Sequence, residues 1–271
     1  MTGASAAAGP AIVFENVRIG FDEGEVLRGV SFSVAPRETA VLLGETGTGK
    51  TLLLKMAAGL VRPDAGRVEV LGRDLGAMDE RELLDFRRQI GFVFQEGALF
   101  DSLSVEENVA FRLREEKMDE KEIAPRVRES LEFVEMAGAI EKLPGELSGG
   151  MRRRVSIARA LVSRPPIVLY DSPTAGLDPV TSQRIITLIL RLRDLQGVTA
   201  LLATHRLQDA FALANFRFDE KACRVVHATE DGAGDGRKTT FLVLRDGGIY
   251  FEGDQHQIRG SGDPYLARFL R

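Results

Sequence analysis

The chain has 271 residues, of which 28% are charged, and its formal net charge at pH 7 is -4. This balance argues against a nucleic-acid binder, because such proteins present a strongly basic surface. Cys223 is the only cysteine, which excludes an intrachain disulfide and agrees with a reducing cytosol. No apolar run approaches the roughly 20 residues of a membrane span. The alanine-rich N-terminus lacks the basic start of a secretory signal.

Short apolar runs alternate with helical patterns along most of the chain. We interpret residues 1–10 as a flexible tail and residues 11–271 as one domain. The runs VFENVRIGF, VLRGVSFSVAP and GRVEVLG predict an N-terminal antiparallel β subdomain. The alternation that follows predicts an α/β fold with a mainly parallel sheet and flanking helices. Its strands are expected at 39–43, 167–170 and 199–204, and its helices at 51–60, 155–163, 180–196 and 207–214.

Two segments interrupt this alternation. Residues 73–164 are charged and largely helical in pattern, which predicts an inserted α-helical subdomain. Residues 216–271 predict a C-terminal β extension with a short helix, and 230–238 (EDGAGDGRK) a flexible turn between the strands CRVVHAT and TTFLVL. The extension is longer than a short strand pair needs. It is either a plain hairpin or a docking surface for a partner.

The segment GETGTGKT, residues 44–51, matches the phosphate-loop pattern GxxxxGK[ST] between a predicted strand and a predicted helix. Glycines let several backbone N–H groups converge on one phosphate, and the helix directs its positive end to the same place. Lys50 is expected to reach the β- and γ-phosphates and Thr51 to bind Mg²⁺. We therefore predict a site for a nucleoside triphosphate at Gly44, Glu45, Thr46, Gly47, Thr48, Gly49, Lys50, Thr51 and Leu52.

A second half of this site is predicted further along the chain. Four apolar residues run into Asp171, the pattern of a Walker B strand whose aspartate holds the Mg²⁺ shell. The run LSGGM, residues 147–151, precedes a basic helix shortly before it. Alone, either pattern is common in strand ends and helix caps. Together with the phosphate loop they indicate a nucleotide triphosphatase.

With these motifs in order, the chain resembles the ATPases of ATP-binding cassette (ABC) transporters over nearly its whole length. LSGGM resembles the ABC signature, Gln95 matches the Q-loop, AGLD at 175–178 the D-loop, and His205 the switch histidine. Phe21 lies where the family has an aromatic residue on the adenine. The resemblance implies an ATPase in which two head-to-tail subunits enclose two ATP molecules. It assigns Mg²⁺ to Thr51, Gln95 and Asp171, catalysis to Asp171, Ser172, His205 and Gln95, and nucleotide contacts also to Ser148, Gly149, Gly150 and Asp178.

The finer resemblance is to the ATPases of Mce- and Mla-type lipid transport systems. It rests on QEGALFDSLSVEENVAF, on the methionine after SGG and on the ending SGDPYLARFL. It implies a homodimer bound to a membrane permease on the inner, cytoplasmic face of the membrane, with a lipid-carrying Mce-type partner. Amino-acid importer ATPases share most of these motifs and remain an alternative. A DNA-repair ABC ATPase would need a long coiled coil between Gln95 and Ser148, and that interval is too short.

The sequence departs from the family at Ser172, where the residue after the Walker B aspartate is normally glutamate. A serine hydroxyl is a poor general base near pH 7. Three interpretations remain: slow hydrolysis with Ser172 or His205 orienting the water, pairing with a subunit that carries the glutamate, or a nucleotide-gated switch with little turnover. The apolar tip Ala98-Leu99-Phe100 after the Q-loop either receives a permease helix or belongs to the core.

Overall fold

The computed structural model of the chain describes residues 9–22, 24–228 and 238–269. Most of the predicted tail, residues 1–8, lies outside the described residues, as does the segment 230–238 apart from Lys238. None of the helices in the described ranges combines the length and hydrophobicity that a bilayer crossing requires.

A six-stranded sheet forms the centre of the molecule, in the order β12-β11-β3-β8-β7-β6. Every neighbouring pair is parallel except β11 and β12, which are antiparallel. Both faces of a parallel sheet are covered by other elements, so its strands read as continuous apolar runs. The strands are β3 (Thr39–Leu43), β6 (Ile90–Val93), β7 (Ile167–Asp171), β8 (Thr199–Thr204), β11 (Thr239–Arg245) and β12 (Gly248–Gly253).

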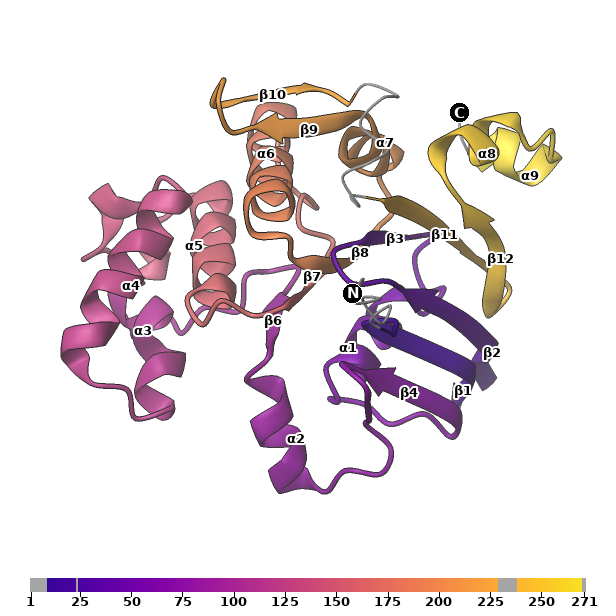
Figure 1. Cartoon of the computed structure of the whole chain (residues 1–271), viewed down its shortest axis with the longest axis horizontal. Helices are drawn as coiled ribbons and strands as arrows, with labels where there is room; N and C mark the ends of the chain where they lie inside the picture. The colour runs from indigo at the N-terminus through magenta and orange to yellow at the C-terminus, as the bar shows by residue number, and fades with distance from the viewer. Residues whose placement is uncertain (1–8, 23, 229–237, 270–271) are drawn as a thin grey trace, which may run out of the picture.

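The two faces of this sheet pack against different layers. Figure 1 shows α6 (Pro179–Gln196) and α7 (Leu207–Asn215) on one face, and α1 (Lys50–Ala57) with the antiparallel sheet on the other. Strand β3 is buried throughout, and alternate residues serve the two sides. Val41 and Leu43 belong to one hydrophobic core, whereas Ala40 and Leu42 belong to the other. The phosphate loop therefore begins at the end of a strand that is covered on both faces.

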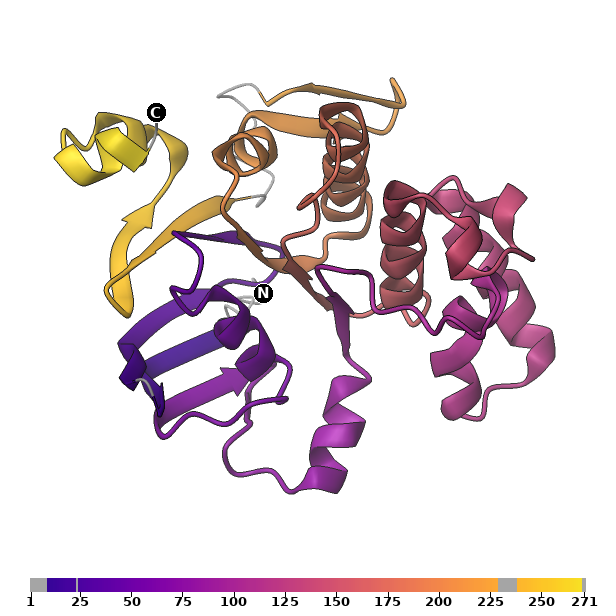
Figure 2. The same ribbon diagram turned by 180° about the vertical axis from the view of Figure 1, so that it is seen from behind.

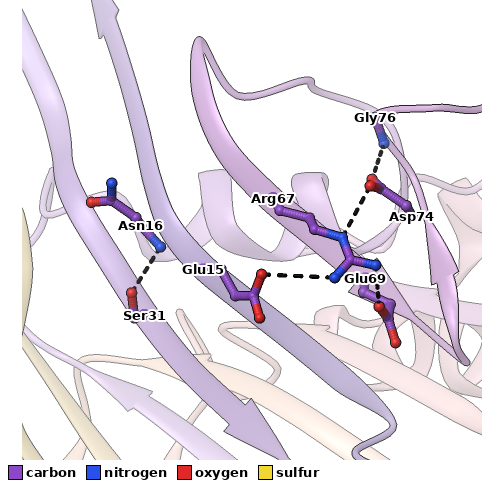
Figure 3. A network of polar contacts seen from close by, with 7 residues as sticks. All are labelled: Glu15, Asn16, Ser31, Arg67, Glu69, Asp74 and Gly76. Carbon is purple, nitrogen blue, oxygen red and sulfur yellow. Dashed lines mark hydrogen bonds and ion pairs between the residues drawn. The ribbon is translucent and has the colours of Figure 1, made fainter.

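The antiparallel sheet has the order β2-β1-β4-β5. Its outer face carries a polar network, in which Arg67 lies between Glu15, Glu69 and Asp74 (Figure 3). The Arg67 side chain is 46% exposed, so solvent screens these ion pairs and they stabilise the fold only weakly. The inner face packs over α1 and holds this sheet beside the phosphate loop. The strands are β1 (Ile12–Phe21), β2 (Gly24–Val34), β4 (Ala65–Val70) and β5 (Arg73–Asp74).

The helical layer is smaller than the predicted insertion over 73–164. Figures 1 and 2 show α3 (Val105–Glu115), α4 (Glu120–Phe133) and α5 (Gly149–Leu161) as one group beside β6, with α2 (Glu80–Arg87) apart from them. The difference is that β5 and β6, which lie inside the range 73–164, belong to the sheets. The run IGFV of β6 is too short for periodicity to separate a strand from a buried helical segment. Helix α5 also begins earlier than predicted, because Ser148 caps it.

The C-terminal region differs from the predicted β extension over 216–271. Strand β11 lies inside the central sheet between β3 and β12, so this part of the chain completes the core. The strands on either side of 230–238 belong to separate sheets. β10 (Arg224–His227) pairs with β9 (Phe216–Asp219), and this hairpin lies across α6 (Figure 1). The chain continues into α8 (Gln255–Gly260) and α9 (Pro264–Phe269).

Candidate nucleotide site

The phosphate loop joins β3 to α1 in a conformation that requires glycine. Gly44, Gly47 and Gly49 have φ of 151°, 86° and 95°, in the left-handed region. A Cβ on Gly49 would lie 2.5 Å from Leu27 of β2, and one on Gly44 would lie 2.7 Å from the carbonyl oxygen of Leu244 in β11. The loop is thus packed between the antiparallel sheet and a C-terminal strand. Its backbone leads directly into the N-terminus of α1, where free N–H groups favour an anion.

Lys50 lies inside this loop. Its Nζ donates to the carbonyl oxygens of Gly44 and Glu45 at 2.9 and 2.6 Å, and to Thr48 Oγ1 at 3.3 Å. Burial lowers the pKa of the ammonium, while the charge of Asp171 opposes that shift. These hydrogen-bond acceptors are all uncharged, so an anion at the loop would gain a strong charge-assisted contact from Lys50.

Thr51 and Asp171 meet at the carboxyl end of the parallel strands. Thr51 Oγ1 lies 3.1 Å from both carboxylate oxygens of Asp171. A hydroxyl beside a carboxylate is the kind of oxygen set that Mg²⁺ prefers, with water and phosphate oxygens completing its shell. The structure places Gln95 just after β6, the strand beside β7, and Gln95 is exposed. These residues fit a magnesium–nucleotide group.

Ser172 follows Asp171 in a left-handed conformation, with φ of 46°, and is buried. Its N–H donates to the carbonyl oxygen of Ala203 at 2.8 Å, and its own carbonyl oxygen accepts from Arg153 Nη1 at 3.3 Å. Its hydroxyl donates to Asp171 Oδ1 at 3.4 Å. The backbone at this position is therefore fixed from both sides, and the side chain faces the Thr51–Asp171 pair.

Arg153 was not predicted as a site residue. It is 5% exposed and its guanidinium donates to the carbonyl oxygens of Phe94 at 3.1 Å, of Gln95 and of Ser172. Burial lowers the pKa of this guanidinium, opposed by the charges of Asp171 and Glu96. Arg153 thus ties the Q-loop backbone to the residue after Asp171. The sequence signal was hidden, because three consecutive arginines looked like one basic helix face.

We expect Arg153→Met to lower the free energy of unfolding by about 1–3 kcal/mol, because it leaves buried carbonyl oxygens without donors. Chemical denaturation measures this change, with Arg128→Met as the control. Arg128 lies exposed on α4 and makes no polar contact within the described residues. If both variants lose equal stability, the three-carbonyl bridge is unimportant for the fold.

A second unpredicted network surrounds the switch position. Thr174 donates to Asp209 of α7, and burial raises the pKa of that carboxyl against the opposing Thr174 hydrogen bond. Arg206 donates to the carbonyl oxygen of Thr174 at 3.3 Å and to Ser182 Oγ at 2.9 Å. His205 lies exposed between β8 and Arg206. The backbone that carries His205 is therefore held to the segment after Asp171.

The signature and the D-loop meet each other at two helix starts. Ser148 caps α5 and its Oγ accepts from the N–H of Met151 at 3.3 Å, while Asp178 caps α6. Hydrogen bonds from Thr181 lower the pKa of Asp178. Among the described residues, no hydrogen bond or ion pair joins Ser148 or Asp178 to the phosphate loop. Phe21, at the end of β1, is 58% exposed.

We expect Gly150→Ala to lower the free energy of unfolding by about 1–3 kcal/mol, since overpacking of a filled site has that effect. The new Cβ would lie 2.3 Å from Cγ2 of Thr181. Gly149→Ala is the matched control, because its Cβ would only touch Leu177 at 3.6 Å and alanine favours a helix. Thermal denaturation compares the two. Addition of Thr181→Ala to Gly150→Ala should restore stability, and failure to do so would contradict this steric explanation.

Comparison with known proteins agrees with this geometry. Residues 27–175 match the family model described as ABC transporter, which includes the phosphate loop, the Q-loop, the signature and Asp171. The chain belongs to the ABC transporter family. The predicted resemblance to ABC transporter ATPases is confirmed at this level.

Several curated ABC proteins are similar to the chain. The probable ribonucleotide transport ATP-binding protein mkl of Mycobacterium leprae is 40% identical over 203 residues, 74% of this chain and 58% of that protein. The protein TRIGALACTOSYLDIACYLGLYCEROL 3, chloroplastic, of Arabidopsis thaliana is 37% identical over 267 residues, 92% and 70% of the two chains. The methionine import ATP-binding protein MetN of Rhizobium meliloti is 40% identical over 207 residues, 74% and 58%. The chain thus spans 58% to 70% of these relatives.

A solved ABC structure shares the fold. The dimeric ATP-binding cassette MJ0796, in a post-hydrolysis state bound to ADP and Pi, is 28% identical with a TM-score of 0.75, over 90% of this chain and 98% of that chain. The predicted fold class, a P-loop NTPase core with an antiparallel β subdomain and a helical subdomain, is confirmed by this match.

Proposed function

We propose that the chain is the ATP-hydrolysing subunit of a lipid transporter, bound to a permease on the cytoplasmic face of the membrane. Two copies would enclose two ATP molecules, with Lys50 and Asp171 of one copy facing Ser148 of the other. The dimeric solved cassette supports this arrangement. The exposed helix start at Ser148 supports it too, because it offers N–H groups to a phosphate outside its own chain. The lipid-carrying Mce-type partner belongs to the same proposal.

One observation favours lipid over other substrates. The relative whose name is that of a galactolipid matches 92% of this chain, whereas the methionine import relative matches 74%. The longer match takes in C-terminal segments such as the hairpin β9–β10 and strand β11. Regions outside the shared catalytic motifs are where proteins of one family differ in partner and cargo.

The proposed chemistry combines the Thr51–Asp171 pair that the structure shows with the other predicted site residues. Thr51 and Asp171, with Gln95, would hold Mg²⁺, which supplies charge neutralisation to the β- and γ-phosphates when bound. Lys50 would bind the same phosphates, and Phe21 would stack on the adenine. His205 and Asp178 would position the water and the γ-phosphate from the switch and the D-loop. Ser172 would orient that water weakly, so we propose slow hydrolysis.

The apolar tip after the Q-loop supports a permease contact. Phe100 is 43% exposed and packs on Phe111, which is 38% exposed, with ring centroids 4.6 Å apart. Leu99 is half buried against the core. Arg159 donates to the carbonyl oxygens of Gly97 and Ala98 and so fixes the loop. Each of the two alternatives for this tip therefore applies to part of it. Leu99 packs against the core, whereas the Phe100–Phe111 pair is available to a permease helix.

The test is reconstitution of the chain with candidate lipid permeases from the same genome, in vesicles that contain a fluorescent phospholipid. We expect transfer of the phospholipid to acceptor vesicles only with Mg-ATP, and none with Lys50→Ala. ATP-driven uptake of methionine without phospholipid transfer would contradict the lipid assignment and favour the amino-acid importer.

Ser172 favours a second candidate function, a nucleotide-gated switch. In that case ATP would close the dimer and release would reopen it, with hardly any hydrolysis. ATP-dependent dimerisation without phosphate release, measured by light scattering and a phosphate assay on the same sample, would favour this candidate.

A further inference from the structure

A groove of 620 Å³ lies between helix α6 and the β9–β10 hairpin, and one end of it reaches Pro179 and Val180, next to Asp178 of the D-loop. We call it the hairpin groove. Its apolar lining consists of Val180, which is 65% exposed, the half-buried Val225, and the buried Leu188 and Phe218. A volume of this size falls in the range of about 300–1,000 Å³ that is typical of small-ligand sites. An apolar floor of this kind gains free energy when a ligand covers it.

The charge around this floor is strongly one-sided. Four arginines line the groove, against a single carboxylate from Glu135. Only one ion pair of the groove is formed within the described residues, between Arg154 and Glu135 at 3.8 Å. The four are Arg154, Arg184, Arg191 and Arg224.

Two of these arginines are available to a ligand. Arg184 and Arg224 are exposed, and in the described part of the chain neither has a carboxylate partner. Arg184 lies near enough to Arg154 to lower its pKa further, after the larger effect of burial. Two like charges held beside an apolar floor are relieved by an anion. Arg191 has a different role, because its guanidinium covers the rings of Phe133 and Phe218 at 4.4 and 5.5 Å.

The apolar floor and the arginines around it together indicate which class of ligand fits the hairpin groove. A free phosphate would pair with the guanidiniums but leave the exposed Val180 and the half-buried Val225 in water. A neutral apolar molecule would cover the floor but strip water from the arginines without pairing them. A molecule with one alkyl chain and a phosphate head satisfies both, since guanidinium and phosphate form bidentate hydrogen bonds. We propose that the hairpin groove binds a single-chain anionic amphiphile, with its phosphate between Arg184 and Arg224 and its chain along α6.

The only cysteine of the chain provides the measurement. Cys223 is exposed and lines the groove at the turn of the hairpin. Its reaction with the neutral reagent N-ethylmaleimide therefore reports on occupancy of this site alone. We expect dodecyl phosphate, below its micelle concentration, to slow the reaction by about tenfold when it is at about ten times its dissociation constant. Inorganic phosphate and the neutral dodecyl maltoside should leave the rate unchanged.

Variants test which residues hold the ligand. Arg184→Glu combined with Arg224→Glu should abolish the protection, whereas Arg81→Glu, an equal charge reversal on the exposed surface of α2, should preserve it. Thermal denaturation of each variant establishes that it is folded, and calorimetry with dodecyl phosphate gives a second readout. Protection by inorganic phosphate alone would overturn the amphiphile in favour of a free anion. Equal protection by dodecyl maltoside, or none by dodecyl phosphate, would also overturn the proposal, the latter leaving an acidic protein partner as the occupant to test.

Discussion

Replacement of Ser172 by glutamate is expected to raise the kcat of Mg-ATP hydrolysis by about 10²-fold or more, since a positioned general base typically contributes about 10² to 10⁴. The backbone at residue 172 is already held in place for such a side chain. The N–H and carbonyl of residue 172 are held by Ala203 and Arg153, and the side chain faces Asp171. Serine and glutamate share the same restriction at φ of 46°, so the change adds little backbone strain.

Ser172→Gln is the matched control for this experiment, because it has the length of glutamate without a basic carboxylate. Phosphate release is measured at high protein concentration, with Lys50→Ala as the blank. If the wild-type protein releases phosphate faster than the blank, and Ser172→Glu changes this rate less than about tenfold, another group already positions the water. If wild type equals the blank and glutamate restores turnover, the natural chain is a switch or needs a partner with the glutamate. Equal gains from glutamine and glutamate would contradict a role as base.

Lys50→Ala is expected to abolish nucleotide binding. Lys50 is the one cation inside the described phosphate loop, and the ammonium is already partly desolvated by burial. Its removal takes away the strongest contact that the loop can offer to a phosphate. The fold should change little, because no charged partner is left buried without its ion pair.

Thermal denaturation with and without Mg-ATP measures this effect. A ligand at about 100 times its dissociation constant stabilises the native state by about 2.7 kcal/mol, so wild type should melt clearly higher with Mg-ATP. Lys50→Ala should not respond. Lys55→Ala, in the last turn of the same helix, is the control and should respond as wild type does. Stabilisation of Lys50→Ala equal to wild type would show that the loop binds phosphate through its backbone alone.

The phosphate loop and the strand that ends at Asp171 were predictable because short stretches of neighbouring residues define them. The spacing of Gly44, Gly49 and Lys50 defines the phosphate loop, and the apolar run before Asp171 defines the strand that carries it. Both statements need only neighbouring residues and the strand–helix alternation. Whether Phe21, His205 and the signature act on the nucleotide stays a prediction.

The rest depends on contacts between distant segments. Arg153 reaches a carbonyl oxygen 59 residues away, and nothing in RRRVSIARAL separates it from its half-buried neighbours Arg152 and Arg154. Strand β6 lies inside the range 73–164 that was predicted to be helical, and β11 lies inside the range 216–271 that was predicted to be a C-terminal β extension. Sheet order is set by tertiary packing, and the sequence contains no local signal for it. The hairpin groove is likewise formed by α6 and a hairpin that follows it in the chain.

The position of β11 beside β3 has a consequence for the order in which the site forms. Thr39 N donates to the carbonyl oxygen of Lys238, and Gly44 packs on the carbonyl of Leu244, about 200 residues further along. Contacts between residues so far apart in the sequence form late in folding. On the ribosome they form later still, because synthesis proceeds from the N-terminus. A nascent chain therefore presents its phosphate loop early but completes its support only when residue 244 has emerged. Nucleotide would then be captured only after β11 has emerged, and ribosome-bound chains ending before β11 that already bind ATP would contradict this order.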